Sequence, residues 1–201
     1  AGNLLRAFNP LMKKDANGAG MIWNTPYSQF VRSEITLAKT WVFGRNSGQS
    51  IATRLLAGAG YAYGNSTALP FEKHFYAGGA NSLRGWQART VGPGTSPMDK
   101  SFVIPNQTGD MKLEANIEYR FDIFWKVAGA LFVDAGNVWT LRNSKSEAVD
   151  SSMFQWKTFG ESIAANWGTG LRLDFGFLLL RFDMGMKIHD PARDAGRWVP
   201  A

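Results

Sequence analysis

The sequence contains no cysteine among its 201 residues, which excludes disulfide bonds and cysteine-ligated metal sites. It has no apolar run approaching the ~18 residues of a membrane-spanning helix, so a helical membrane protein is also excluded. Residues 1–6 include no apolar core of a signal peptide, which indicates a mature or internal segment. With 45% hydrophobic and 19% charged residues, the chain is nevertheless expected to fold.

Clusters of chemically reactive residues are scarce as well. The formal net charge is +6, but the 22 basic residues are scattered and never form a run of four, which argues against a nucleic-acid partner. His74 and His189 are the only histidines, and no acidic cluster at ligand spacing flanks them, so we expect no metal and no cofactor. Residues 160–164 approach the G-x-S-x-G hydrolase motif but end in alanine, without a helical pattern after them. We therefore reject a metal site and a hydrolase site at these residues.

The dominant pattern is an alternation of apolar and polar residues. In Met111–Phe124 every odd position from Leu113 to Ile123 is apolar, whereas every even position from Lys112 to Asp122 is polar. A β-strand sends successive side chains to opposite faces, so this segment predicts a strand with one apolar and one charged face. The same alternation recurs in five further segments, at 31–43, 55–63, 127–136, 167–175 and 178–187.

The connections between these six segments alternate between short and long. Short links fall near residues 44–50, at Phe124-Trp125 and at Gly176-Phe177, whereas long links cover 64–109, 141–163 and the region after 188. We therefore predict an all-β antiparallel meander with tight turns at one end and long loops at the other. This asymmetry is typical of outer-membrane β-barrels.

The distribution of aromatic residues favours a membrane over water as the surrounding medium. Aromatic side chains stand near the strand ends, where membrane barrels carry their aromatic girdles; they are Trp41, Phe43, Tyr61, Tyr63, Trp125, Trp139, Trp167 and Phe175. Strands of ten residues or more also exceed the five or six that are usual in soluble sheets. The alternation alone would fit a soluble β-sandwich too, and that alternative stays open at this point.

For a membrane barrel, the strict period of two assigns each side chain to the lipid or to the lumen. The predicted lipid-facing residues are Leu113, Ile117, Phe121, Leu131, Val133, Leu171, Leu173, Leu180 and Phe182. The predicted lumen-facing residues are Glu114, Glu118, Arg120, Phe132, Asp134, Arg172, Arg181 and Asp183.

Six strands cannot close a barrel in lipid, where eight is the usual minimum. An open edge in hydrocarbon would leave unpaired backbone groups at several kcal/mol each. The chain also ends at residues 198–201 in a predicted loop. We therefore expect residues 1–201 to be part of a C-terminal membrane β-barrel.

The long link at 64–109 contains a recognisable motif. Its sequence includes Phe75, the pair Gly78-Gly79 and the tetrapeptide Leu83-Arg84-Gly85-Trp86. Further along, 132–136 reads Phe-Val-Asp-Ala-Gly, and Glu118 occupies an acidic position on the preceding strand. In these three motifs the chain resembles the BamA/TamA superfamily of outer-membrane assembly and translocation proteins, although that family usually has Phe or Tyr where Trp86 stands.

The resemblance implies a sixteen-stranded barrel behind periplasmic POTRA domains, in which these six strands would be the tenth to fifteenth. It places the chain in the outer membrane of a Gram-negative bacterium, as part of a non-enzymatic insertase or translocase that opens a lateral seam. The implied partners are outer-membrane lipid, unfolded outer-membrane protein clients, and inner-membrane or periplasmic assembly proteins that bind the POTRA domains. The motif wording is closest to the TamA-like lipoprotein branch of Bacteroidetes.

Three other functions remain open at this point. The chain could belong to a two-partner polypeptide secretion pore, to the barrel anchor of a larger lipase-type protein, or to a passive diffusion porin. The domains that precede the barrel would discriminate among them: several POTRA repeats favour assembly, two favour secretion, and a hydrolase domain favours the anchor.

The resemblance makes Arg84 the central candidate residue, carried by its loop into the lumen. An unpaired guanidinium there would be costly, so it needs acceptors. Glu118 and Asp134 lie on the lumen face of adjacent predicted strands, where both could bind one guanidinium. Glu114 on the same face is a second-choice acceptor. The alternative is that Arg84 lies in a solvated loop.

Supporting roles are expected for the residues around Arg84. Gly85 would allow a tight turn, and Trp86 would pack against Phe132. The motif glycines Gly78, Gly79 and Gly136 complete the candidate set. Gly58 and Gly60 on the second strand would make room for the inserted loop or mark bends in the wall.

Overall fold

The computed structural model describes residues 20–22, 25–44, 48–97, 106–142, 151–193 and 198. Its main element is one antiparallel sheet of six strands, ordered as in the sequence. The strands are β3 (Phe30–Phe43), β4 (Gln49–Ala62), β5 (Met111–Phe124), β6 (Val127–Trp139), β7 (Ala164–Asp174) and β8 (Leu179–His189). The smaller elements are β1 (Met21–Ile22), β2 (Thr25–Pro26), η3 (Phe71–Lys73), η4 (Trp156–Thr158) and α2 (Phe159–Ser162).

All six predicted strands are present, and β5 has the predicted bounds. Strand β4 begins at Gln49, six residues before the predicted start at residue 55. The prediction started late because polar Thr53, on the outward face, interrupts the apolar alternation. Backbone pairing with β3 and β5 nevertheless continues through this stretch. The links follow the predicted alternation: 44–48, 125–126 and 175–178 are short, whereas 63–110 and 140–163 are long. Among the described residues, no helix has the length and apolar character needed to cross a bilayer.

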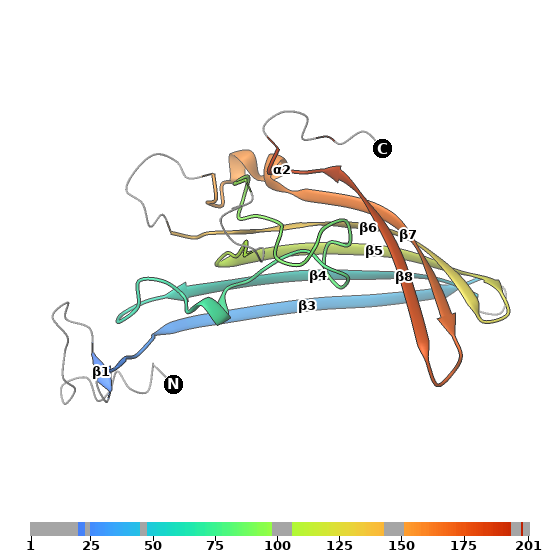
Figure 1. Ribbon diagram of the computed structural model, residues 1–201, viewed down its shortest axis with the longest axis horizontal. Helices are drawn as coiled ribbons and strands as arrows, with labels where there is room; N and C mark the ends of the chain where they lie inside the picture. Colours follow the sequence, from blue (N-terminus) through green and yellow to red (C-terminus); the bar gives the residue numbers. More distant parts are fainter. Residues whose placement is uncertain are drawn as a thin grey trace.

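Burial across the sheet is inverted relative to a water-soluble protein. Outward apolar side chains are open, with 55% of Ile117 and 59% of Phe182 exposed, while Glu118 and Asp134 are buried. A soluble sandwich would cover its apolar face and expose its charges. The sandwich interpretation is therefore wrong, and the sheet is a curved wall of a transmembrane β-barrel (Figure 1). We call the face with the buried charges the lumen face.

One predicted girdle residue does not face lipid. Trp139, at the end of β6, is fully buried and stacks against Phe159, with ring centroids 5.8 Å apart. Phe154 meets it edge-on at 5.5 Å, and the indole N–H donates to Ser162 Oγ at 3.1 Å. Phe154, Phe159 and Ser162 of the 140–163 link cover this end of β6. Trp139 is therefore buried, although its odd position in the strand places it on the outward face.

The assignment of the two faces leads to a first prediction, on adjacent residues of β3. Ile35 is outward and 61% exposed, whereas Thr36 is on the lumen face. In a lipid bilayer, Ile35→Lys is expected to lower the free energy of unfolding by roughly 2–4 kcal/mol, because it places an ammonium in hydrocarbon. Thr36→Lys, at the same depth, should change it by less than about 1 kcal/mol. Urea titrations of the full-length protein in vesicles would measure both, and equal losses would contradict the assignment.

Candidate functional site

The link between β4 and β5 covers residues 63–110, and its described parts, 63–97 and 106–110, lie on the lumen face and contact all six strands. In Figure 1 its green part runs across the middle of the sheet. The outermost contacts reach both edges: Arg32 of β3 lies 4.0 Å from the centre of the Phe75 ring, and Arg181 of β8 donates to Ala80 O at 3.0 Å. We call this link the inserted loop. Side chains of Phe75 and Leu69 occupy the space where Cβ atoms on Gly58 and Gly60 would lie, which confirms that these glycines make room for it.

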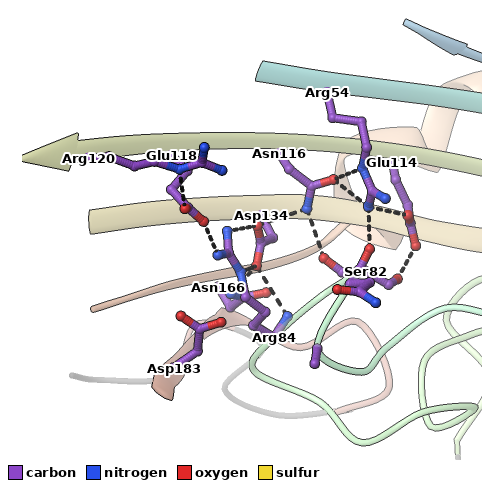
Figure 2. A network of polar contacts seen from close by, with 12 residues as sticks. Arg54, Ser82, Arg84, Glu114, Asn116, Glu118, Arg120, Asp134, Asn166 and Asp183 are labelled. Atoms are coloured by element: carbon purple, nitrogen blue, oxygen red, sulfur yellow. Dashed lines mark hydrogen bonds and ion pairs between the residues drawn. The ribbon is translucent and has the colours of Figure 1, made fainter. Parts of the chain in front are cut away.

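Arg84, in the inserted loop, binds the carboxylate of Asp134 with two parallel hydrogen bonds. Its Nε donates to Oδ2 at 2.9 Å and its Nη2 donates to Oδ1 at 2.8 Å (Figure 2). The backbone N–H of Arg84 adds a third bond to Oδ2 at 3.1 Å. Its Nη1 donates to Glu118. The loop therefore places Arg84 between both predicted acceptors and out of bulk solvent.

The guanidinium of Arg84 also stacks on an aromatic ring. Its central carbon lies 3.4 Å from the centroid of Phe132, a geometry that adds a cation–π attraction. The predicted contact between Trp86 and Phe132 is wrong. Trp86 instead packs in a buried apolar cluster with Phe75, Ala77, Leu83, Val91, Val138 and Ala164. The larger indole fills space between loop and wall, and Arg84 takes the place above Phe132.

Asp134 is held by a row of amides across the sheet. The register aligns Asn116 on β5 with Asp134 on β6 and Asn166 on β7. Asn116 Nδ2 donates to Asp134 Oδ1 at 2.8 Å, and Asn166 Nδ2 donates to Oδ2 at 3.0 Å. With the three bonds from Arg84, five donors converge on one carboxylate. A fully buried anion requires this degree of hydrogen bonding to be stable.

Glu118 extends the network toward the short turns. It accepts from Arg120 Nε at 2.8 Å and from Arg172 Nη2 at 3.2 Å. Arg172 also donates to Asp183, at 2.6 Å. Burial disfavours the charge on Arg84, but its hydrogen bonds with Asp134 and Glu118 prevail and raise the pKa of the guanidinium. Arg84 therefore stays cationic at any pH at which cells grow.

A second anchor holds the inserted loop two residues before Arg84. Ser82 Oγ donates to Glu114 of β5 and accepts the Gly78 N–H at 3.0 Å. Glu114 also binds Arg54 at 3.2 Å and Lys112 at 2.9 Å. Glu114 is therefore the acceptor of this second anchor and not, as predicted, an alternative acceptor for Arg84.

The two anchors share one amide side chain, that of Asn116. Its Nδ2 donates to Ser82 O at 2.8 Å as well as to Asp134, and its Oδ1 accepts from Arg54 Nε at 3.0 Å (Figure 2). Asn116 therefore joins the Ser82 anchor to the Arg84 anchor in a continuous network.

Glycines allow the motif to approach the wall closely. Gly85 lies in the expected tight turn, which the Trp86 N–H closes by donating to Leu83 O at 3.1 Å, and it has no positive φ there. A glycine is required because a Cβ at this position would lie 2.8 Å from that of Asn166. A Cβ on Gly185 of β8 would lie 2.8 Å from the backbone carbon of Arg84. Gly78 and Gly79 do have positive φ angles, of 94° and 95°, which favour glycine. Gly136 faces Glu114 across the β5–β6 pair.

The close approach at Gly185 leads to a second prediction. Gly185→Ala is expected to loosen loop docking by roughly 1–3 kcal/mol, because the backbone of Arg84 cannot yield as a flexible side chain would. Gly160→Ala is the matched control, since its Cβ would meet nothing within 4 Å. Limited proteolysis of the inserted loop in the full-length protein would compare them. Equal cleavage rates in both variants and the parent would show that the inserted loop does not pack closely against β8.

The pattern of the sequence did not reveal Ser82, Asn116, Asn166 and Arg54 as members of the site. Parity alone could have placed Asn116 and Asn166 on the lumen face, but alignment of both with Asp134 depends on register. Among the described residues, no group of three or more metal-binding side chains could hold an ion.

Comparison with known proteins decides the family. Residues 20–198 match the Omp85 superfamily domain. The chain belongs to the Omp85 superfamily. This match confirms the resemblance drawn from the three motifs, and it covers every strand of the sheet.

Two BamA proteins are similar to this Omp85 chain. The outer membrane protein assembly factor BamA of Neisseria meningitidis serogroup B (strain ATCC BAA-335 / MC58) is 29% identical over 119 residues, which cover 57% of this chain and 15% of that protein. The crystal structure of BamA from Haemophilus ducreyi lacking POTRA domains 1–3 matches with a TM-score of 0.65 at 20% identity, over 86% of this chain and 34% of that one. The chain thus spans a minor part of either relative's length, and the structural match shows the fold.

Proposed function

We propose that this chain forms part of the barrel of an outer-membrane protein that assembles or translocates other proteins. Membership of the Omp85 superfamily and similarity to BamA support the proposal at the level of the family. The outer membrane of a Gram-negative bacterium would be its location, with lipid on the apolar face. Its clients would be unfolded outer-membrane proteins, and its action would be non-enzymatic.

The observation that carries the proposal is the inserted loop, fixed by Arg84 to Asp134 and Glu118. The inserted loop contacts all six described strands, and its buried ion pairs fix it to β5 and β6. An assembly barrel needs a rigid wall beside a seam that opens, because an unpaired strand edge would template the client strand. We propose that the inserted loop braces that wall, in a sixteen-stranded barrel that follows POTRA domains.

The test uses the full-length protein in lipid vesicles. A urea-denatured outer-membrane β-barrel protein would be added, and its folding followed by the resistance of the folded form to SDS at room temperature. We expect faster folding than in vesicles that contain an unrelated porin at the same density. The same folding rate in both vesicle preparations would contradict an assembly function.

A further inference from the structure

Two cavities on the lumen face are not accounted for by the loop anchors. One, of about 490 Å³, lies between β3, β4 and the tip of the inserted loop. Another, of about 560 Å³, extends to the short turns. Arg120 and Arg181 line both, so the two spaces adjoin at these side chains. We call the combined space the arginine basin.

The charges that line the basin are mostly positive in its loop-proximal part. Arg54, Arg84, Arg120 and Arg181 surround the first cavity, and Glu118 is its one carboxylate. Glu118 is already engaged, because it accepts from Arg84, Arg120 and Arg172. At the short-turn end, Lys126 and Arg172 stand beside Asp122 and Asp174, and Asp174 accepts the Gly176 N–H at 2.7 Å.

Several guanidinium N–H groups in the basin have no acceptor within the described part of the chain. Arg120 uses only its Nε, toward Glu118, and 48% of its side chain is exposed. Arg181 uses Nε toward Asp183 and Nη2 toward Ala80 O, which leaves its Nη1. A charged donor that is partly desolvated and unpaired favours an anionic acceptor.

The shape of the basin indicates what kind of anion fits. Its lining on β5 runs from Asn116 to Asp122, about 20 Å at roughly 3.3 Å per residue. Between Arg120 on β5 and Asp183 on β8, the register places the small residues Ala130 and Gly170, and the ion pair of Arg172 with Asp183 lies over Gly170. Along β5 the basin therefore has the length of about six residues of an extended chain.

From this geometry we propose that the arginine basin binds an extended, acidic polypeptide segment, whose carboxylates pair with Arg120 and Arg181. Lipid is the less suitable ligand, because the basin opens on the face opposite to the exposed apolar side chains. The inference rests on the proposed function, since it requires a lumen that polypeptide can enter.

The test measures peptide binding directly to the purified full-length protein in detergent. The probe is a fluorescent ten-residue peptide that alternates Glu and Ser, compared by anisotropy with its Gln/Ser counterpart. We expect the acidic peptide to bind at least tenfold more tightly at low salt, and the difference to shrink as salt screens the charges. Arg120→Gln and Arg181→Gln should each weaken the acidic peptide roughly tenfold.

Lys73→Gln serves as the control. Lys73 is an exposed cation of the inserted loop, and its side chain lines neither cavity. Arg120→Glu should weaken the acidic peptide more than Arg120→Gln does, because it adds a repelling carboxylate. A variant is compared only if its mobility in SDS gels without heating is that of a folded barrel. Arg120→Gln and Arg181→Gln are independent tests, so one of them suffices if the other does not fold.

Three results would overturn the inference: equal binding of acidic and neutral peptides, equal weakening by Lys73→Gln, or displacement of the peptide by inorganic phosphate at equal charge. The last would indicate a simple anion site, open to any phosphate group. A protein that folds clients but binds no acidic peptide contradicts this inference alone. A protein that binds the peptide but folds no clients contradicts the proposed function alone.

Discussion

Replacing Arg84 with alanine is expected to release the inserted loop from the wall while the six strands stay paired. The change leaves Asp134 and Glu118 close together without their shared cation. Removing one partner of a buried ion pair typically costs about 3–5 kcal/mol, and water in the lumen would reduce that figure. The strands keep their backbone ladder, so the loss should fall on loop docking and on client assembly.

Two measurements in the full-length protein check this expectation. Protease cleavage of the inserted loop should become faster by more than tenfold, and client folding in vesicles should slow. Lys157→Ala is a suitable control, because it removes an exposed cation from the 140–163 link. Unchanged cleavage and unchanged folding in Arg84→Ala would contradict the proposed bracing role.

Arg84→Lys should recover only part of the loss. A guanidinium presents two parallel N–H groups to Asp134 and a third to Glu118, with its flat face on Phe132. An ammonium is a point charge that cannot hold this planar arrangement. Full recovery by lysine would mean that charge alone, without geometry, fixes the loop.

The faces of the strands were predictable from the sequence because the side-chain period of a strand is two. The pairing of Arg84 with Asp134 and Glu118 was predictable only because the family resemblance placed Arg84 in the lumen. The cost of an unpaired buried cation and strand parity then selected the two acceptors. The resemblance to the family was recognisable because each of its motifs is a short local segment of the sequence.

The row of Asn116, Asp134 and Asn166 was not predictable by the same reasoning. A slip of two residues between strands preserves every face, yet it would move Asn116 about 6.6 Å along its neighbour and away from Asp134. Register therefore decides the row, and period-two patterns leave it undetermined. The positions of Ser82 and Trp86 were not predicted correctly for a related reason. The path of a loop depends on long-range packing, which no local pattern encodes.

Asp134→Asn is expected to disrupt the site far more than Glu118→Gln. Asp134 Oδ1 accepts from Arg84 Nη2 and Asn116, while Oδ2 accepts from the Arg84 backbone, Arg84 Nε and Asn166. Whichever way an asparagine amide turns, its NH₂ faces at least two donors in a fully buried position. The loss combines a missing charge with donor–donor repulsion, and we expect about 3–5 kcal/mol.

Glu118→Gln has an escape that Asp134→Asn lacks. Its amide oxygen can stay on Arg84 while its NH₂ turns toward Arg120 and Arg172. Arg120 is 48% exposed and can turn into water, and Arg172 loses a contact of 3.2 Å but keeps Asp183 as its acceptor. The expected cost is roughly 1.5–3 kcal/mol, that of weakening a hydrogen bond to a charged group. Proteolysis of the inserted loop should therefore rank the proteins as parent, Glu118→Gln and Asp134→Asn in order of increasing cleavage. If Glu118→Gln is cleaved as fast as Asp134→Asn or faster, the five-donor arrangement around Asp134 is not what holds the loop.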